Sequence, residues 1–194
     1  MGRGQTLRGG SVMPCAAVSA GTPGSRPPAG GIEIRRGYEP GLIGRAAELH
    51  GRYYAEAWGS GAPFESLIAR EFGEFVEGYD AGDDLLLSAH KAGRVVGMIA
   101  IYGRRRLPEG AQLRFFIVDP ACHGCGAGKA LLAEALSWCR ERGFSKVFLW
   151  TVDGLPASRR LYEKAGFRVT DRVPDDRYTV LRDNLRFELD LSTI

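Results

Sequence analysis

The sequence lacks any apolar run that approaches the roughly 18 residues of a membrane-spanning helix, which predicts that no membrane is a partner. Cysteine is also scarce, because four residues in a chain of 194 are too few for a disulfide framework. We therefore expect reduced thiols and a cytoplasmic location. The formal charge of +3 comes from three arginines within residues 1–31, where no acidic residue balances them. Residues 32–194 are neutral overall, which argues against a broad nucleic-acid-binding surface.

Large apolar side chains are nearly absent from residues 1–31, which hold 8 of the 27 glycines and 4 of the 10 prolines. Such a segment cannot bury enough surface to offset the entropy of ordering it, so we interpret residues 1–31 as a disordered leader. Residues 12–20 faintly resemble a secretory signal, but Pro14 and Ser19 interrupt them. Residues 32–194 have the size of one globular domain.

Hydrophobic periodicity along residues 32–194 predicts both strands and helices. Apolar residues at helical spacing mark four helices, at 42–58, 64–79, 126–142 and 156–164. Runs rich in β-branched and aromatic residues mark seven strands, at 32–37, 84–90, 94–103, 111–119, 146–152, 167–173 and 185–191. The order is therefore βααβββαβαββ. Because the strands on either side of the third helix need a right-handed crossover, we expect a single-domain α/β fold with a mixed, mainly antiparallel twisted sheet and helices on both faces.

The segment FFIVDPACHGCGAGKALLAEAL, residues 115–136, runs from an apolar strand through a glycine-rich bend into an amphipathic helix. A metal, a redox disulfide or a phosphate could each occupy the bend. Structural zinc needs four ligands, and no second close pair of cysteines accompanies Cys122 and Cys125, so we expect no metal. A nucleotide P-loop is excluded because Ala130 follows Lys129 where Ser or Thr is required.

Redox chemistry and anion binding remain as interpretations of the bend, beside a tight turn that binds nothing. A Cys-x-x-Cys pair before a helix suits a redox disulfide, since helix-terminal amides lower the pKa of a thiol. That chemistry leaves Gly124, Gly126 and Gly128 unexplained. Without Cβ atoms at these positions, the main-chain N–H groups of residues 123–129 can converge on an anion at the helix N-terminus. The bend therefore favours a pyrophosphate site.

Two motifs, in this order and spacing, resemble those of the GNAT N-acetyltransferase superfamily. The first is VDP at residues 118–120, followed by HGCGAG at 123–128, and the second is LYEKAGF at 161–167. More narrowly, LRFFIVDP and FLWTVDGLPASRRLYEKAGF resemble acetyltransferase domains that occur fused to MarR-type regulators. Two residues depart from the family pattern: His123 replaces an Arg or Gln, and Leu155 replaces an Asn before the last helix.

The resemblance implies transfer of an acetyl group from acetyl-CoA to a primary amine, by direct attack on the thioester. It also implies that the fourth strand parts from the fifth and offers main-chain groups to the pantetheine arm. Tyr162 is the expected general acid, and Glu109, before the fourth strand, is the candidate base acting through water. The predicted cofactor-binding residues are Phe116, Ile117, Val118, His123, Gly124, Cys125, Gly126, Ala127, Gly128, Lys129 and Arg159.

The expected partners are acetyl-CoA and an amine acceptor, and the family resemblance is consistent with a homodimer. A non-catalytic module that binds acyl-CoA for regulation is the alternative function, because such a module would keep the glycine bend without needing Tyr162. The sequence does not identify the acceptor, since its pocket is expected to come from the first two helices and from residues 174–184.

Overall fold

A computed structural model describes residues 31–103, 109–175 and 182–192. The predicted leader, apart from Gly31, lies outside the described residues. The predicted order of elements and the mixed, mainly antiparallel sheet are confirmed. In chain order the elements are β1 (Ile32–Arg36), α1 (Leu42–Trp58), α2 (Ala62–Glu77), β2 (Leu85–Lys91), β3 (Arg94–Tyr102), β4 (Ala111–Val118), the 3₁₀ turn η1 (Pro120–Cys122), α3 (Ala127–Glu141), β5 (Lys146–Val152), α4 (Pro156–Lys164), β6 (Arg168–Asp175) and β7 (Arg182–Asp190).

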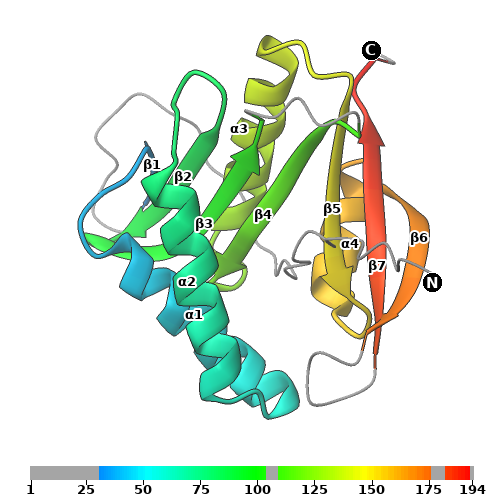
Figure 1. Ribbon diagram of the computed structural model, residues 1–194. Helices are drawn as coiled ribbons and strands as arrows, with labels where there is room; N and C mark the ends of the chain where they lie inside the picture. Colours follow the sequence, from blue (N-terminus) through cyan, green and yellow to red (C-terminus); the bar gives the residue numbers. More distant parts are fainter. Residues whose placement is uncertain (1–30, 104–108, 176–181, 193–194) are drawn as a thin grey trace, which may run out of the picture.

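The helices form two layers, one on each face of the sheet (Figure 1). The strand order is β1-β2-β3-β4-β5-β7-β6, in which β4 and β5 are the parallel pair and the other neighbours are antiparallel. α1 and α2 bury their apolar stripes on one face with Leu86, Met98 and Phe115. α3 and α4 cover the other face, where Leu131 and Tyr162 join the second core cluster.

Element boundaries follow local chain chemistry. α2 begins at Ala62, before the predicted residue 64, because Pro63 fits the first turn, where its missing N–H has no helical acceptor. α1 ends at Trp58 and is capped by Gly59, whose φ of +70° suits a residue without a Cβ. β7 begins at Arg182, earlier than the predicted residue 185, because the pairing with β6 continues to the pair Asp175 and Arg182.

A bulge in β4 bends the strand at two consecutive phenylalanines. Arg114 pairs with Ala100 and Ile117 with Met98, so two residues of β4 lie opposite one of β3. Phe115 adopts a φ of +49°, which is uncommon for a residue with a side chain. Its ring lies in the α1/α2 cluster while the ring of Phe116 lies in the opposite cluster. Bulges of this kind bend a strand and increase its twist.

The parallel pairing of β4 with β5 is short. It joins Ala111 to Val147 and Gln112 to Phe148, both before the bulge. Beyond these pairs the two strands diverge, and α4 lies behind β5 (Figure 1). The carboxyl-terminal half of β4 therefore presents main-chain groups that do not pair with β5, which agrees with the divergence that the family resemblance implies.

A buried ion pair attaches α2 to β4 beside the bulge. Arg114 Nη2 donates to Glu71 Oε2 at 2.5 Å, and both side chains are about one-tenth exposed. The guanidinium carbon lies 5.1 Å from the ring centroid of Tyr102 and 4.8 Å from that of Phe115. These contacts hold the Phe115 ring and restrict how α2 can move relative to the strand.

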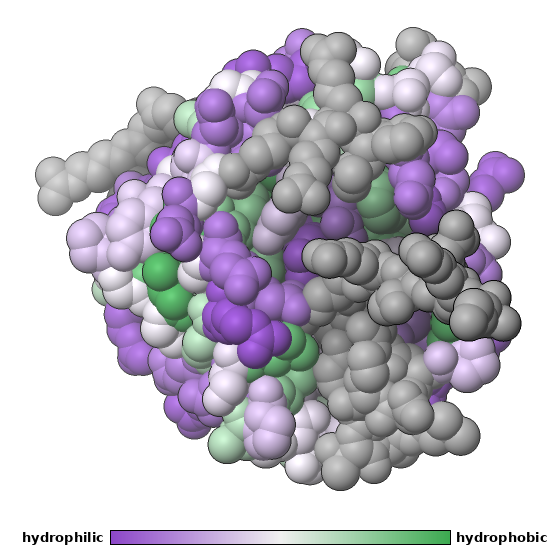
Figure 2. Space-filling view, in the orientation of Figure 1, coloured by the Kyte–Doolittle hydropathy of each residue, from purple (hydrophilic) through white to green (hydrophobic). Residues whose placement is uncertain are grey.

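The face shown in Figure 2 is mainly hydrophilic, with hydrophobic residues in small separated areas. Among the described residues the exposed large hydrophobic side chains are Tyr38, Val169 and Val173. None of the helices in this part of the chain combines the length and the apolar character that crossing a lipid bilayer requires.

His50 of α1 is fully buried against the bulge. Its Nδ1 lies 2.8 Å from the Ala46 carbonyl oxygen, and its ring stacks on Tyr54 and meets the Phe115 ring edge-on. Burial lowers the pKa of His50 from 6.5 to about 4, although the bond to Ala46 acts in the opposite direction. The imidazole is therefore neutral at pH 7.

We predict that His50→Phe removes an acid-sensitive part of the folding stability. As the pH falls below about 6.5, the unfolded chain binds a proton at His50 that the folded chain does not bind until about pH 4. This difference destabilises the folded protein by about 3 kcal/mol near pH 4. Urea unfolding measures the free energy of unfolding at pH 7 and at pH 4. The decrease between the two should be smaller in the variant than in the wild type by this amount. Equal losses in the two proteins would contradict the assignment.

Candidate active site

The loop between β4 and α3 uses some of its amides internally and leaves others open. The Cys122 amide donates to the Asp119 carbonyl, the His123 amide to the Pro120 carbonyl, and the Cys125 amide to the Cys122 carbonyl. In the described chain, the amide of Gly124 and those of residues 126–129 have no main-chain acceptor. Since α3 begins at residue 127, most of these open amides belong to its first turn, where an anion is favoured.

Two glycines of the loop are required by backbone geometry. Gly124 has a φ of +80° and Gly126 a φ of +102°, in the left-handed region that side chains disfavour. Gly128 instead lies buried in the first turn of α3. The His123 ring folds back on the strand, with Nε2 3.3 Å from the Val118 carbonyl oxygen. In the described loop the amides of Gly124 and residues 126–129 thus stay open, while those of His123 and Cys125 are already used.

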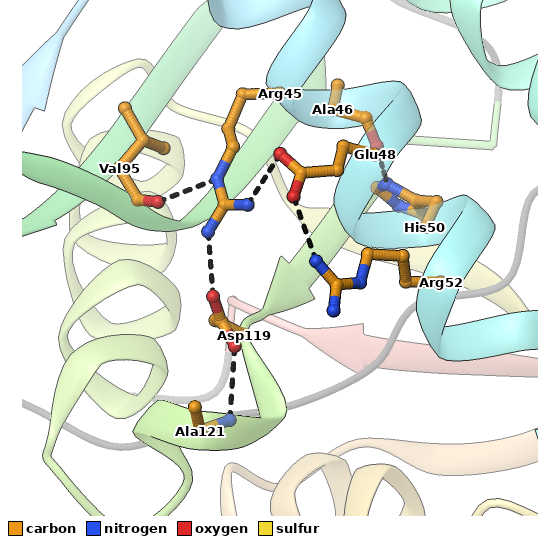
Figure 3. Close-up of polar contacts among 8 residues, drawn as sticks. All are labelled: Arg45, Ala46, Glu48, His50, Arg52, Val95, Asp119 and Ala121. Carbon is orange, nitrogen blue, oxygen red and sulfur yellow. Dashed lines mark hydrogen bonds and ion pairs between the residues drawn. The ribbon is translucent and has the colours of Figure 1, made fainter. Parts of the chain in front are cut away.

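Arg45 of α1 fixes the start of this loop by contacting three parts of the chain (Figure 3). Its Nη2 lies 2.7 Å from Asp119 Oδ2, its Nε donates to the Val95 carbonyl at 2.9 Å, and its Nη1 lies 2.7 Å from Glu48 Oε2. Asp119 Oδ1 accepts from the Ala121 amide at 3.1 Å. The carboxylate therefore caps the 3₁₀ turn while the guanidinium ties it to α1 and β3.

The charges of this network support one another. Partial burial alone would raise the pKa of Asp119, but the hydrogen bonds from Arg45 and the Ala121 amide lower it below its usual value. The hydrogen bond from Arg45 likewise lowers the pKa of Glu48. Both carboxylates are thus held in the ionised form that Arg45 needs. Sequence reasoning missed Arg45, because no spacing rule reveals which of many arginines faces Asp119.

Tyr162 lies on the α3/α4 side of the diverging strands and is fully buried. Its ring centroid is 6.2 Å from that of Phe116 on β4, 5.8 Å from Phe167 and 5.6 Å from Phe187 on β7. The structure thus brings Tyr162 to the part of β4 that has lost its pairing with β5. It does so through the second of the two phenylalanines at the bulge.

Glu109 lies at the opposite end of β4, before the strand begins. Its Oε2 pairs with Arg186 Nη1 at 2.5 Å, and the side chain is half exposed. The length of β4 separates Glu109 from the glycine loop by on the order of 20 Å. The structure therefore places Glu109 at the end of β4 away from the open amides.

A cavity of ≈ 120 Å³ lies between the end of β5, the start of α4 and β7. Thr151, Phe187 and Arg159 are among the residues that line it, and Arg159 Nε also donates to Glu163 Oε1 at 2.8 Å. Leu155 lines the cavity too, yet it is buried in the α1/α2 cluster. The departure from Asn at position 155 thus provides an apolar side chain that reaches across the diverging strands.

The family model described as "Acetyltransferase (GNAT) family" matches residues 44–167, a range that contains the glycine loop, Tyr162 and the divergence of β4 from β5. The chain belongs to the GNAT acetyltransferase family. The GNAT fold is also found in solved structures that resemble this one. A PaiA N-acetyltransferase from Thermoplasma acidophilum in complex with coenzyme A has a TM-score of 0.64 at 22% identity, covering 82% of this chain and 98% of that one. A ribosomal-protein-alanine N-acetyltransferase from Brucella melitensis has a TM-score of 0.65 at 19% identity, covering 81% and 99%.

Curated relatives of this GNAT chain match over shorter stretches. A mycothiol acetyltransferase of Salinispora arenicola is 35% identical over 85 residues, which cover 42% of this chain and 28% of that protein. A glucosamine 6-phosphate N-acetyltransferase of Trypanosoma brucei brucei is 33% identical over 84 residues, covering 41% and 55%. The chain therefore spans less than two thirds of the length of either relative.

The thiols near the GNAT loop give little support to the redox interpretation. Cys122 and Cys125 are free and half-buried. Burial and the neighbouring Cys122 raise the pKa of Cys125, whereas a reactive thiol needs a lowered pKa. Burial also raises the pKa of Cys139 to about 12. Among the described residues no three His, Cys, Asp or Glu side chains lie close enough together to hold a metal ion.

We predict that Arg45→Ala weakens coenzyme A binding about tenfold. The variant loses the charge-assisted contact with Asp119 at the end of β4, and this contact fixes the start of the loop that carries the open amides. Isothermal titration with coenzyme A provides the measurement. Arg52→Ala is the matched control. The Arg52 side chain is 73% exposed and contacts Glu48 alone among the carboxylates of the network, so the affinity of this variant for coenzyme A should stay within twofold. Equal affinities of the two variants would contradict the role of Arg45.

Proposed function

We propose that this acetyltransferase transfers the acetyl group of acetyl-CoA to a primary amine by direct attack on the thioester. The observation that carries the proposal is the divergence of β4 from β5 beside the open amides of the α3 N-terminus. A diphosphate at those amides would leave the pantetheine arm room to follow the unpaired edge of β4. Residues Phe116, Ile117 and Val118 form that edge.

The reaction forms one bond and breaks another. The amine nitrogen attacks the thioester carbon, the C–N bond forms, the C–S bond breaks, and coenzyme A leaves as a thiolate. A main-chain N–H of the unpaired part of β4 would stabilise the oxyanion that develops on the carbonyl oxygen, with a contribution of about 3 kcal/mol if it acts like a single oxyanion-hole donor. Tyr162, beside Phe116, would protonate the thiolate.

The cofactor contacts follow from the same geometry. The amides of Gly124, Gly126, Ala127, Gly128 and Lys129 would donate to the diphosphate. Arg159, at the cavity beside β5, would contact a phosphate or the pantetheine arm. For His123 and Cys125 the contribution would be to hold the loop, since their amides donate within it.

Removal of the proton from the incoming ammonium is not routed through Glu109 in this mechanism. Glu109 stays a sequence prediction for the general base, but its carboxylate neutralises Arg186 at the far end of β4. As a base, Glu109 would accept that proton through water.

A cytoplasmic location and a homodimer also stay predictions from the sequence. β6 offers a surface for self-association, because it is the last strand of the sheet and exposes Val169 and Val173. Light scattering coupled to size-exclusion chromatography would measure the mass in solution.

We predict that Tyr162→Phe lowers the turnover number by roughly 10²-fold, because the thiolate loses its proton donor, while the affinity for coenzyme A changes little. A thiol reagent would follow the release of coenzyme A from acetyl-CoA over a panel of amines. Tyr38→Phe, at an exposed tyrosine, is the matched control. Unchanged turnover in Tyr162→Phe would leave this tyrosine a packing role only.

The same assay separates the enzyme from the regulatory alternative. An acetyltransferase releases coenzyme A at a rate that depends on the amine. A non-catalytic acyl-CoA-binding module would bind coenzyme A yet release it no faster with amine than without. That second result would contradict the proposed transfer.

A further inference from the structure

The two faces of the sheet give the two substrates separate approaches. Most of the open amides belong to the first turn of α3, which lies on the α3/α4 face with Tyr162. If acetyl-CoA enters from that face and passes its thioester between β4 and β5, the amine must arrive from the α1/α2 face. Its entrance then lies where the carboxyl-terminal ends of the two parallel strands are farthest apart.

A contact between Trp58 and Arg182 spans that entrance. Trp58 is the last residue of α1, which packs on β3 and β4. Arg182 is the first residue of β7, which pairs with β5. The Arg182 guanidinium carbon lies 5.4 Å from the centroid of the Trp58 ring. The β5–α4 turn also reaches Arg182, since a Cβ on Gly154 would lie 2.7 Å from its Nη1.

The charge of Arg182 is not neutralised within the described chain. No carboxylate there lies within ion-pair distance of its guanidinium, and its Nε is buried without a hydrogen-bond acceptor. Asp153 and Asp183 are neighbours of this turn, but both pair with Arg172, at 3.1 Å and 2.6 Å. By contrast, Arg45 has two carboxylate partners. A half-buried guanidinium without an anion is costly to desolvate, and a bound anion would reduce that cost.

We propose that Arg182, held against Trp58, recognises an anionic group on the acceptor, so that the preferred amine carries a phosphate or a carboxylate in addition to its amino group. This inference rests on the proposed acetyl transfer for the position of the entrance. Arg182 selects the acceptor and takes no part in the chemical step. The planar guanidinium can bind two oxygens of either anion.

Matched pairs of amines test the selection, because each pair differs in one anionic group. Glucosamine 6-phosphate is compared with glucosamine, and phenylalanine with phenylalanine amide, which separates phosphate from carboxylate. We expect the wild-type kcat/KM to favour an anionic member by roughly 10- to 100-fold. Arg182→Gln should remove that preference and change the kcat/KM of the neutral members less than about threefold. Arg182→Lys, which keeps the charge, should retain part of it.

The control is Arg168→Gln, at an exposed arginine of β6, which should behave as wild type. Isothermal titration of glucosamine 6-phosphate into coenzyme A-saturated protein adds a measurement that needs no turnover. If no amine releases coenzyme A but the phosphate binds through Arg182, the proposed function fails and the anion site stands. Two outcomes would contradict the role of Arg182. In the first, wild-type kcat/KM is equal within both pairs of amines and both sugars bind equally. In the second, Arg182→Gln and Arg168→Gln lose the preference for the anionic amine to the same extent.

Discussion

The short parallel pairing between β4 and β5 is the constraint on which the rest of the structure depends. Two residue pairs hold the strands together, and the bulge at Phe115 then bends β4 away from its neighbour. An unpaired strand edge inside a protein would normally be unfavourable, because buried main-chain groups need hydrogen-bond partners. A cofactor arm that carries amides can supply them. The fold thus leaves an internal unpaired strand edge by interrupting its own sheet.

Side chains packed around the bulge stabilise the separation of β4 from β5. Arg114 and Phe115 are consecutive, yet both side chains face the α1/α2 layer. Because side chains alternate between the two faces of a regular strand, straightening β4 would force the Phe115 and Phe116 rings into the wrong layers. The buried pair of Arg114 and Glu71 then fixes the Phe115 side of the strand, and Tyr162 packs on the Phe116 side. At the end of β4, Arg45 and Asp119 fix the direction in which the chain enters the glycine loop.

The sequence predicts features that depend on local periodicity better than features that depend on distant contacts. The bounds of α1, α4 and β5 agree with the predicted ranges, since apolar spacing and Gly or Pro punctuation are local properties. The bulge carries no such signal, because Phe115 adopts a positive φ where no glycine marks the position. Glu109 is the sequence candidate for the base because it closely precedes β4 in the chain. A strand has two ends, however, and the pairing with Arg186 holds Glu109 at the end away from the loop.

The arginines show that the role of a side chain depends on the groups it contacts, and that residue type alone does not predict it. Arg45 and Arg114 have carboxylate partners, so their charge is used in holding elements together. Arg186 is also paired and additionally covers the ring of Phe148. Arg182 has an aromatic ring as its neighbour instead, and the acids of the adjacent turn contact Arg172. Since an aromatic face lowers the electrostatic energy of a cation without cancelling its charge, the field of Arg182 remains available at the entrance to an incoming anion.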